Sequence, residues 1–196
     1  MRSDKTGEQA MLVRARRGDP QAFGELFDLH RDRVFRQALR MTRSVHDAED
    51  VTGMVFLEAW RRREALTEVD GSVIGWLLLT ANNVSRNLSR SIRRYRHTLS
   101  TLPSPEDSPD HSNAIDERLD SHPQLTVLRE ALARLPRRDQ DVLSLCVLEE
   151  LSMADAAAVL NIPTGTVKSR LSRAKARLHA LVAPADALIS MEGGDR

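Results

Sequence analysis

Near the C-terminus, cationic side chains recur along a stretch whose chemistry is that of phosphate and base recognition. The charged residues are Lys168, Arg170, Arg173, Lys175 and Arg177. No acidic residue lies between Thr164 and Val182. Guanidinium and ammonium groups neutralise DNA phosphates and donate hydrogen bonds to base edges in the major groove. Such charge is also typical of a plain solvated helix face, so the neighbouring residues decide between the two interpretations.

The residues around this charge predict two short helices joined by a tight turn. Ser152 can cap the first helix with Asp155 as its capping-box acid, and Asn161-Ile162-Pro163 ends it. Thr164 is expected to cap the second helix. The small apolar face of the first helix consists of Ala154, Ala157, Ala158 and Leu160. The buried stripe of the second helix consists of Val167, Leu171, Ala174, Leu178 and Leu181. This pattern predicts a helix-turn-helix whose second helix enters a DNA major groove.

A second basic helix is predicted over residues 76–96, where Trp76, Leu77, Thr80, Val84, Leu88 and Ile92 form the apolar stripe. Its arginines, with no acid among them, are Arg86, Arg90, Arg93, Arg94 and Arg96. Arginines hold phosphates, and the amides of Asn82 and Asn83 can hydrogen-bond to exposed base edges. The alternative is that both asparagines are ordinary exposed helical residues. Trp76 is expected in the core rather than as a stacking platform.

Residues 44–63 form a third predicted helix in which the charges are separated by sign. Asp47, Glu49 and Asp50 lie in its first turns and Arg61–Arg63 at its end, as the helix dipole favours. The residues expected to face the core are Val51, Val55, Phe56, Ala59 and Trp60.

Composition and periodicity predict an all-α chain of two small helical domains joined by a flexible acidic linker. The 196 residues suffice for two such domains, and helical periodicity dominates over any strand alternation. Residues 1–97 hold 18 Lys and Arg against 13 Asp and Glu, whereas residues 98–123 hold 1 against 6. The remaining residues hold 10 against 9. The acidic segment therefore separates two parts that each concentrate positive charge locally.

Several function classes are not supported by the sequence. The single cysteine, Cys146, is expected to be a buried thiol, and His97, His111 and His122 lack ligand spacing, so no metal site is predicted. No apolar run approaches the roughly 20 residues that span a bilayer, and the N-terminus lacks a signal core. We find no nucleophile–base pair, P-loop or dinucleotide glycine pattern, so neither enzymatic activity nor a cofactor is expected. A cytoplasmic, nucleoid-associated location is expected.

The C-terminal motif is similar to a known one. Residues 161–175, NIPTGTVKSRLSRAK, resemble the promoter −35 reading helix of extracytoplasmic-function (ECF, group 4, sigma-70 family) sigma factors, whose usual form is G-I-P-x-G-T-V-K-S-R-L-x-R-A-R. Residues 135–148, LPRRDQDVLSLCVL, resemble the start of sigma region 4. The resemblance implies a region 4 helix-turn-helix over residues 123–183. Pro184 and the Gly193-Gly194 pair predict a flexible tail over residues 184–196.

The N-terminal half resembles sigma region 2 of the same family. Residues 18–41, GDPQAFGELFDLHRDRVFRQALRM, resemble its opening helices. DAEDVTGMVFLEAW resembles region 2.2, D-A-E-D-x-x-Q-[DE]-x-F-x-x-A-W, with Gly53 and Met54 replacing the usual Gln and acid. The helix from Trp76 resembles regions 2.3 to 2.4, W-L-x-x-I-A-x-N-x-x-x-D-x-x-R, with Thr80 and Asn87 replacing Ile and Asp. The resemblance implies region 2 over residues 1–97 and the acidic linker over residues 98–122.

The resemblance also implies partners and contact residues. The partners are core RNA polymerase (through its β′ coiled coil and β flap), promoter DNA and an anti-sigma factor, with no membrane insertion. The implied −35 contacts are Thr164, Thr166, Lys168, Ser169, Arg170, Ser172, Arg173, Lys175 and Arg177. The implied −10 contacts are Asn82, Asn83, Arg86, Asn87, Arg90, Arg93 and Arg94. The implied polymerase contacts are Asp47, Glu49, Asp50, Gly53, Met54 and Glu58.

Two other functions stay open on the sequence alone. In a stand-alone helix-turn-helix regulator, the helix from Trp76 would be ordinary and the first domain would serve effector binding or dimerisation. In a protein-interaction module that docks on polymerase, promoter opening would be absent. The loop over residues 64–75 has no aromatic residue for base stacking, so any base capture there would use polar contacts or shape.

Overall fold

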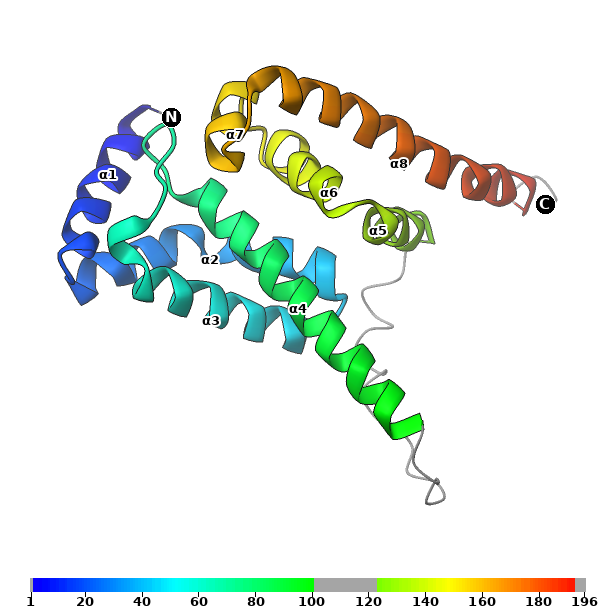
Figure 1. Ribbon diagram of the computed structural model, residues 1–196, viewed down its shortest axis with the longest axis horizontal. Coiled ribbons are helices and arrows are strands. Elements are labelled where there is room, and N and C mark those ends of the chain that lie inside the picture. Colours follow the sequence, from blue (N-terminus) through cyan, green and yellow to red (C-terminus); the bar gives the residue numbers. More distant parts are fainter. Residues whose placement is uncertain (1, 101–122, 193–196) are drawn as a thin grey trace. The chain divides into compact units, whose positions relative to one another are not determined.

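The computed structural model describes residues 2–100 and 123–192, and all the regular elements that it describes, apart from one isolated β-bridge, are helical. The N-terminal elements are α1 (Arg2–Arg16), α2 (Pro20–Thr42), α3 (Val45–Arg61), η1 (Arg63–Ala65) and α4 (Ile74–Ser100). The C-terminal elements are α5 (Pro123–Arg134), α6 (Arg137–Leu143), η4 (Ser144–Leu148), α7 (Met153–Leu160) and α8 (Thr164–Glu192). The all-α prediction is confirmed (Figure 1).

The chain divides into two compact units. One holds Ala10–Leu66 and Leu77–Ser121, and the other holds Met1–Gln9, Thr67–Trp76 and His122–Arg196. Most of the predicted linker, residues 101–122, lies outside the described residues, and α4 continues to Ser100, beyond the predicted limit at residue 97. The domain limits given by the sequence therefore stay a prediction.

The junction between α1 and α2 forms where Gly, Asp and Pro follow one another. Gly18 takes a φ of 88°, which favours glycine, and ends the first helix. The Asp19 carboxylate then caps α2 by accepting hydrogen bonds from the amides of Gln21 (2.9 Å) and Ala22 (3.2 Å), with Pro20 in the first turn. The Ala22 amide and the Arg14 side chain hold the pKa of Asp19 below its usual value. The predicted start of α2 is confirmed.

Helices α2 and α3 pack side by side around an apolar and aromatic core (Figure 1). Four positions on α3 with helical spacing are buried, namely Val51, Val55, Phe56 and Ala59. The rings of Phe27 and Phe56 meet edge to face at 4.7 Å between centroids, and those of Phe23 and Trp60 at 5.1 Å. Ser44 caps α3 as its side chain accepts from the Asp47 amide. The core face predicted for this helix is confirmed, with Trp60 at its half-buried edge.

The segment between η1 and α4 turns back on itself through Asp70 and Gly71. Both residues take positive φ, 51° and 77°, and Val69 and Ser72 exchange backbone hydrogen bonds at 2.9 and 3.1 Å. An Asp-Gly pair between two bridged residues is typical of a type I′ turn. The segment was predicted only as a loop, and α4 begins at Ile74, before the predicted Trp76.

The C-terminal helices close around a leucine-rich cluster. The cluster consists of Leu132, Leu135, Leu143, Leu171, Ala174, Leu178 and Leu181. The single helix predicted over residues 137–148 is α6 followed by the π-helical turn η4. Cys146, predicted to be buried, is half-buried in η4, because the wider turn leaves Leu145 fully inward. Partial burial raises the pKa of the Cys146 thiol.

The last helix is longer than the sequence analysis expected. A tail was predicted from residue 184, because proline removes one backbone donor and disfavours a helical predecessor. Helix α8 nevertheless continues through Pro184 to Glu192. Alanines on both sides of this proline, at 183, 185 and 187, have high helix propensity and favour its continuation. None of the described helices is long and apolar enough to cross a membrane.

Candidate nucleic-acid interface

The turn between α7 and α8 has the geometry of a helix-turn-helix. The Ser152 hydroxyl accepts from the Asp155 amide at 3.1 Å and donates to its carboxylate at 2.6 Å, so the predicted cap of α7 is confirmed. Asn161 ends α7 in the left-handed region at φ 51°. The predicted Thr164 cap is wrong by one residue, because α8 already begins at Thr164. The cap position falls on Pro163, whose carbonyl accepts from the Thr166 and Val167 amides at 2.9 and 3.2 Å.

Small residues bring α7 close to α8, although not all of those that were predicted. Ala156 and Ala157 are buried, whereas Ala154 and Ala158 are exposed. The predicted small face is therefore rotated by part of a turn. On α8, Val167 and Ala174 are fully buried, and Leu171, Leu178 and Leu181 are partly buried as predicted. This apolar side holds α8 in place and leaves its basic side outward.

The outward side of α8 carries most of the residues predicted to contact the −35 element. The exposed ones are Thr164, Lys168, Ser169, Ser172, Arg173, Lys175 and Arg177, while Thr166 and Arg170 are half-buried. Lys168, Ser172 and Lys175 fall within about 60° of one another around the helix. The Arg173 Nε donates to the Ser169 carbonyl at 3.2 Å, which lays its guanidinium along the helix. The geometry is that of a helix able to place cations and hydroxyls in a groove.

The outward side of α4 forms a second basic face. Asn83, Asn87, Arg90 and Arg94 are exposed and Arg86 is half-buried, and these five lie within about 100° around the helix. The side chain of Arg93 lies outside the described residues. Backing this face, Leu77, Leu78 and Ala81 are buried. Helix α4 can therefore offer guanidinium groups and amides together to a nucleic-acid strand.

One predicted −10 contact lies elsewhere. The side chain of Asn82 is fully buried, and its Oδ1 accepts from the Gln37 Nε2 of α2 at 2.6 Å. Asn82 therefore joins two helices, whereas its neighbour Asn83 is exposed. Adjacent residues on a helix point about 100° apart, which separates the two at the edge of the core. The predicted −10 contact set is therefore corrected at Asn82, which lies in the core.

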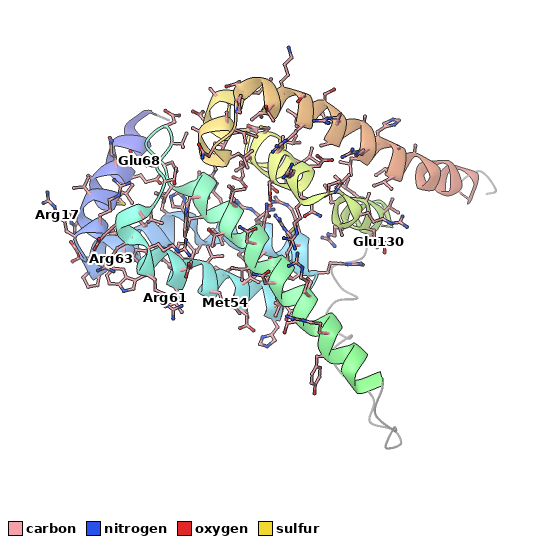
Figure 2. The ribbon with its side chains drawn as sticks, in the orientation of Figure 1. Arg17, Met54, Arg61, Arg63, Glu68 and Glu130 are labelled. Carbon is pink, nitrogen blue, oxygen red and sulfur yellow. The ribbon has the colours of Figure 1, made fainter. Side chains whose placement is uncertain are left out.

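The outward side of α3 combines carboxylates with exposed apolar surface. Glu49, Asp50 and Gly53 are exposed, and Met54 and Leu57 are 45% and 48% exposed. Figure 2 labels Met54 on α3. Asp47 and Glu58 are half-buried, the latter paired through Oε1 with the Arg62 Nε at 2.5 Å. The set predicted to contact polymerase is thus brought together on one helix. Leu57 was missed, although its spacing of three residues from Met54 places it on the same face.

Comparison with known proteins fits this arrangement. The model for Sigma-70 region 2 matches residues 26–95, and that for Sigma-70, region 4 matches residues 125–178. ECF RNA polymerase sigma factor SigL of Mycobacterium tuberculosis is 33% identical over 150 residues, which cover 74% of this chain and 80% of SigL. The chain belongs to the ECF RNA polymerase sigma factors. It is therefore an RNA polymerase sigma factor that directs transcription, and a stand-alone regulator is not favoured.

A further relative and two solved structures are also similar to this chain. ECF RNA polymerase sigma factor SigW of Bacillus subtilis is 24% identical over 173 residues, covering 85% of this chain and 92% of SigW. The solved structure of CnrH in complex with the cytosolic domain of CnrY matches with a TM-score of 0.64 at 24% identity, covering 91% of this chain and 98% of that one. The sigma factor RpoE from Bartonella quintana, solved with the anti-sigma factor NepR, has a TM-score of 0.54 at 24% identity, covering 82% and 96%. The two structures show a shared fold.

In this sigma factor, Arg177 has a partner that its position on the basic helix does not reveal. Its Nη1 donates to the Asp139 Oδ2 of α6, and the Asp139 side chain is only 7% exposed. Arg177 was expected to hold a DNA phosphate. Its guanidinium neutralises a buried carboxylate and ties α6 to α8, and its contact with the −35 element stays a prediction.

We expect Arg177→Ala to lower the free energy of unfolding by about 1–3 kcal/mol, because the buried Asp139 carboxylate would lose its charged partner. Urea denaturation followed by circular dichroism measures this. The matched control is Arg173→Ala, an exposed arginine one turn earlier, which should change stability by less than about 0.5 kcal/mol. Adding Asp139→Asn should recover part of the loss, and no recovery would contradict the pairing.

Proposed function

We propose that this sigma factor binds core RNA polymerase through α3 and selects promoters through two separate DNA-binding surfaces. Helix α8 would read the −35 element and α4 would bind the −10 element. The observation that carries the proposal is that both helices keep basic faces exposed while their apolar faces are buried. Each face can therefore meet DNA without unfolding its own unit.

The residues divide by chemistry within the −35 surface. Lys168, Ser172 and Lys175 lie on one exposed side of α8, in its N-terminal half. The N-terminal part of a recognition helix is the part that contacts base edges. Thr164 and Thr166 lie in its first turn, where hydroxyls and backbone amides can meet a phosphate. Arg170 and Arg173 lie farther round the helix and suit phosphate contacts. Binding should therefore weaken steeply as salt rises.

Helix α3 supplies the polymerase surface in this proposal. Met54 and Leu57 give apolar area that a partner can bury, and Glu49 and Asp50 give charge at the same helix face. A Cβ added at Gly53 would meet open space, because no heavy atom beyond its chain neighbours and the nearby helix backbone lies within 4 Å. The β′ coiled coil of polymerase, itself helical, is the partner that the family implies for this face, with the β flap meeting region 4.

Three further features follow from family membership. RNA synthesis would belong to the polymerase, and the sigma factor would have no catalytic activity or cofactor of its own. It would act at the nucleoid, where promoters are. An anti-sigma factor is proposed as a further partner that would compete for these surfaces.

The test is run-off transcription with purified core polymerase on fragments of the genome. Adding the sigma factor should produce transcript starts that core polymerase alone does not, preceded by a shared pair of sequence elements. The protein should also co-elute with core polymerase in gel filtration. If it instead shifts a duplex without polymerase and produces no starts, the stand-alone regulator is the better description. Co-elution without any transcript would favour the polymerase-docking module.

A further inference from the structure

Hydrogen-bonded polar side chains link α2 to Asn82 in α4, beside the basic face of that helix. Gln37 is 1% exposed, and its Nε2 donates to the Asn82 Oδ1 at 2.6 Å. The Gln37 Oε1 in turn accepts from the Arg40 Nη1 at 3.0 Å. Three side chains from two helices, one of them a guanidinium, are thus joined by hydrogen bonds.

Arg40 determines which groups donate and which accept in these hydrogen bonds. A guanidinium only donates hydrogen bonds, so the Gln37 amide must present its oxygen to Arg40 and its nitrogen to Asn82. Asn82 must then present its oxygen to Gln37. Both amides therefore have one permitted orientation, and a buried amide held by a charged donor is costly to rearrange.

These hydrogen bonds end at the edge of the proposed −10 surface. Asn82 lies about 40° around α4 from Arg86 and about 100° from Asn83. The hydrogen bond from Gln37 therefore reaches α4 on the side where its basic face begins. Arg40 is half-buried on α2, and its hydrogen bond to Gln37, which in turn bonds Asn82, places its guanidinium near this edge of α4.

We propose that Arg40 extends the −10 surface from α4 onto α2 and contacts a DNA phosphate, with Gln37 and Asn82 as the positioning residues that hold it there. This inference rests on the proposed promoter-binding function of α4. Cationic side chains from α2 and α4 would contact phosphates of the same DNA strand from two directions. These contacts would fix the position of the strand relative to Asn83. Asn82 is buried and does not contact a base, but it would help to position Arg40 in this interface.

The test measures how binding of the sigma–polymerase complex to a promoter fragment depends on salt. The fragment is one recovered by run-off transcription, with the −10 region single-stranded. Arg40→Met keeps the aliphatic stem and removes the charge. It should weaken binding about tenfold and reduce the slope of log K against log salt by roughly 0.7, the value for one phosphate on a single strand. A merely structural role would not change that slope.

The matched control is Arg31→Met, on the opposite side of α2 at about 180° from Arg40, which should leave the slope unchanged. Gln37→Met should reduce affinity as Arg40→Met does, and the double variant should lose no more than either alone. Thermal denaturation checks whether Gln37→Met folds. If Gln37→Met does not fold, the inference is tested with Arg40→Met alone.

If Arg40→Met and Arg31→Met have equal slopes of log K against log salt, the inference about Arg40 is wrong. The proposed function still stands in that case if the wild-type protein is active in run-off transcription. Loss of co-elution with core polymerase in Arg40→Met, with an unchanged slope, also overturns the inference, because the partner would then be protein. Absence of transcripts from the wild type would instead reject the proposed function itself.

Discussion

Reversing two charges on α8, Lys168→Glu together with Arg173→Glu, is expected to weaken −35-dependent promoter binding about 100- to 1,000-fold. Each lost contact to a base edge or phosphate costs about 1–3 kcal/mol, and the new carboxylates add repulsion from DNA. Both side chains are exposed, so the fold should persist. Glutamate is a good helix former, and an acid near the start of α8 suits the helix dipole.

The measurement compares run-off transcription from one promoter with that from the same promoter whose −35 element has been replaced. Wild-type protein should distinguish the two strongly, whereas the double variant should transcribe both weakly and equally. Arg17→Glu with Arg31→Glu is the control, because it makes the same change in net charge at two exposed arginines, one in the turn after α1 and one on α2. If the control loses as much activity, the effect is one of overall charge and α8 is not the reading helix.

The sequence predicted two helix starts correctly from local caps, although the Thr164 cap was wrong by one residue and Pro184 does not end α8. Asp19-Pro20 and Ser152 with Asp155 are caps formed by residues within three positions, and both are present. The buried stripe of α8 follows from spacing alone. Local patterns also placed the basic faces of α4 and α8 outward, because apolar residues on the opposite side are sufficient to orient a helix.

The contact residues were harder to predict, because single partners far away in sequence decide them. The family resemblance implies a −35 contact for Arg177, but it does not reveal the ion pair with Asp139, which lies 38 residues earlier. Asn82 and Asn83 are identical in type and adjacent, so only the position of Gln37, 45 residues away, separates them. Periodicity gives the centre of a helix face accurately, but it leaves residues at the edge undetermined.

The second large effect is expected on α3. Met54→Glu together with Leu57→Glu should weaken binding to core polymerase by about 100-fold or more. These are the exposed apolar side chains of the proposed docking face, and apolar anchors at the centre of an interface carry most of its affinity. Neither residue is buried in the unit itself, so thermal stability should stay within about 0.5 kcal/mol of wild type. Co-elution with core polymerase and titration of run-off activity measure the loss.

Leu29→Glu is the matched control, because Leu29 is 38% exposed on α2 and lies outside the proposed docking face. It should retain wild-type polymerase binding, and a loss equal to that of the α3 variant would show general destabilisation rather than docking.

A substitution on the same face of α3 is expected to raise stability and to keep or raise polymerase affinity. Gly53→Gln introduces a side chain where no heavy atom beyond the chain neighbours and the nearby helix backbone lies within 4 Å of the added Cβ. It should raise helix stability by about 1 kcal/mol, because glycine is the costliest residue here apart from proline. It would also restore the amide that the family pattern places at this position, so polymerase affinity should rise or hold. Weaker binding by Gly53→Gln would show that the partner needs the open space at Gly53, and that this sigma factor docks in a way its family pattern does not describe.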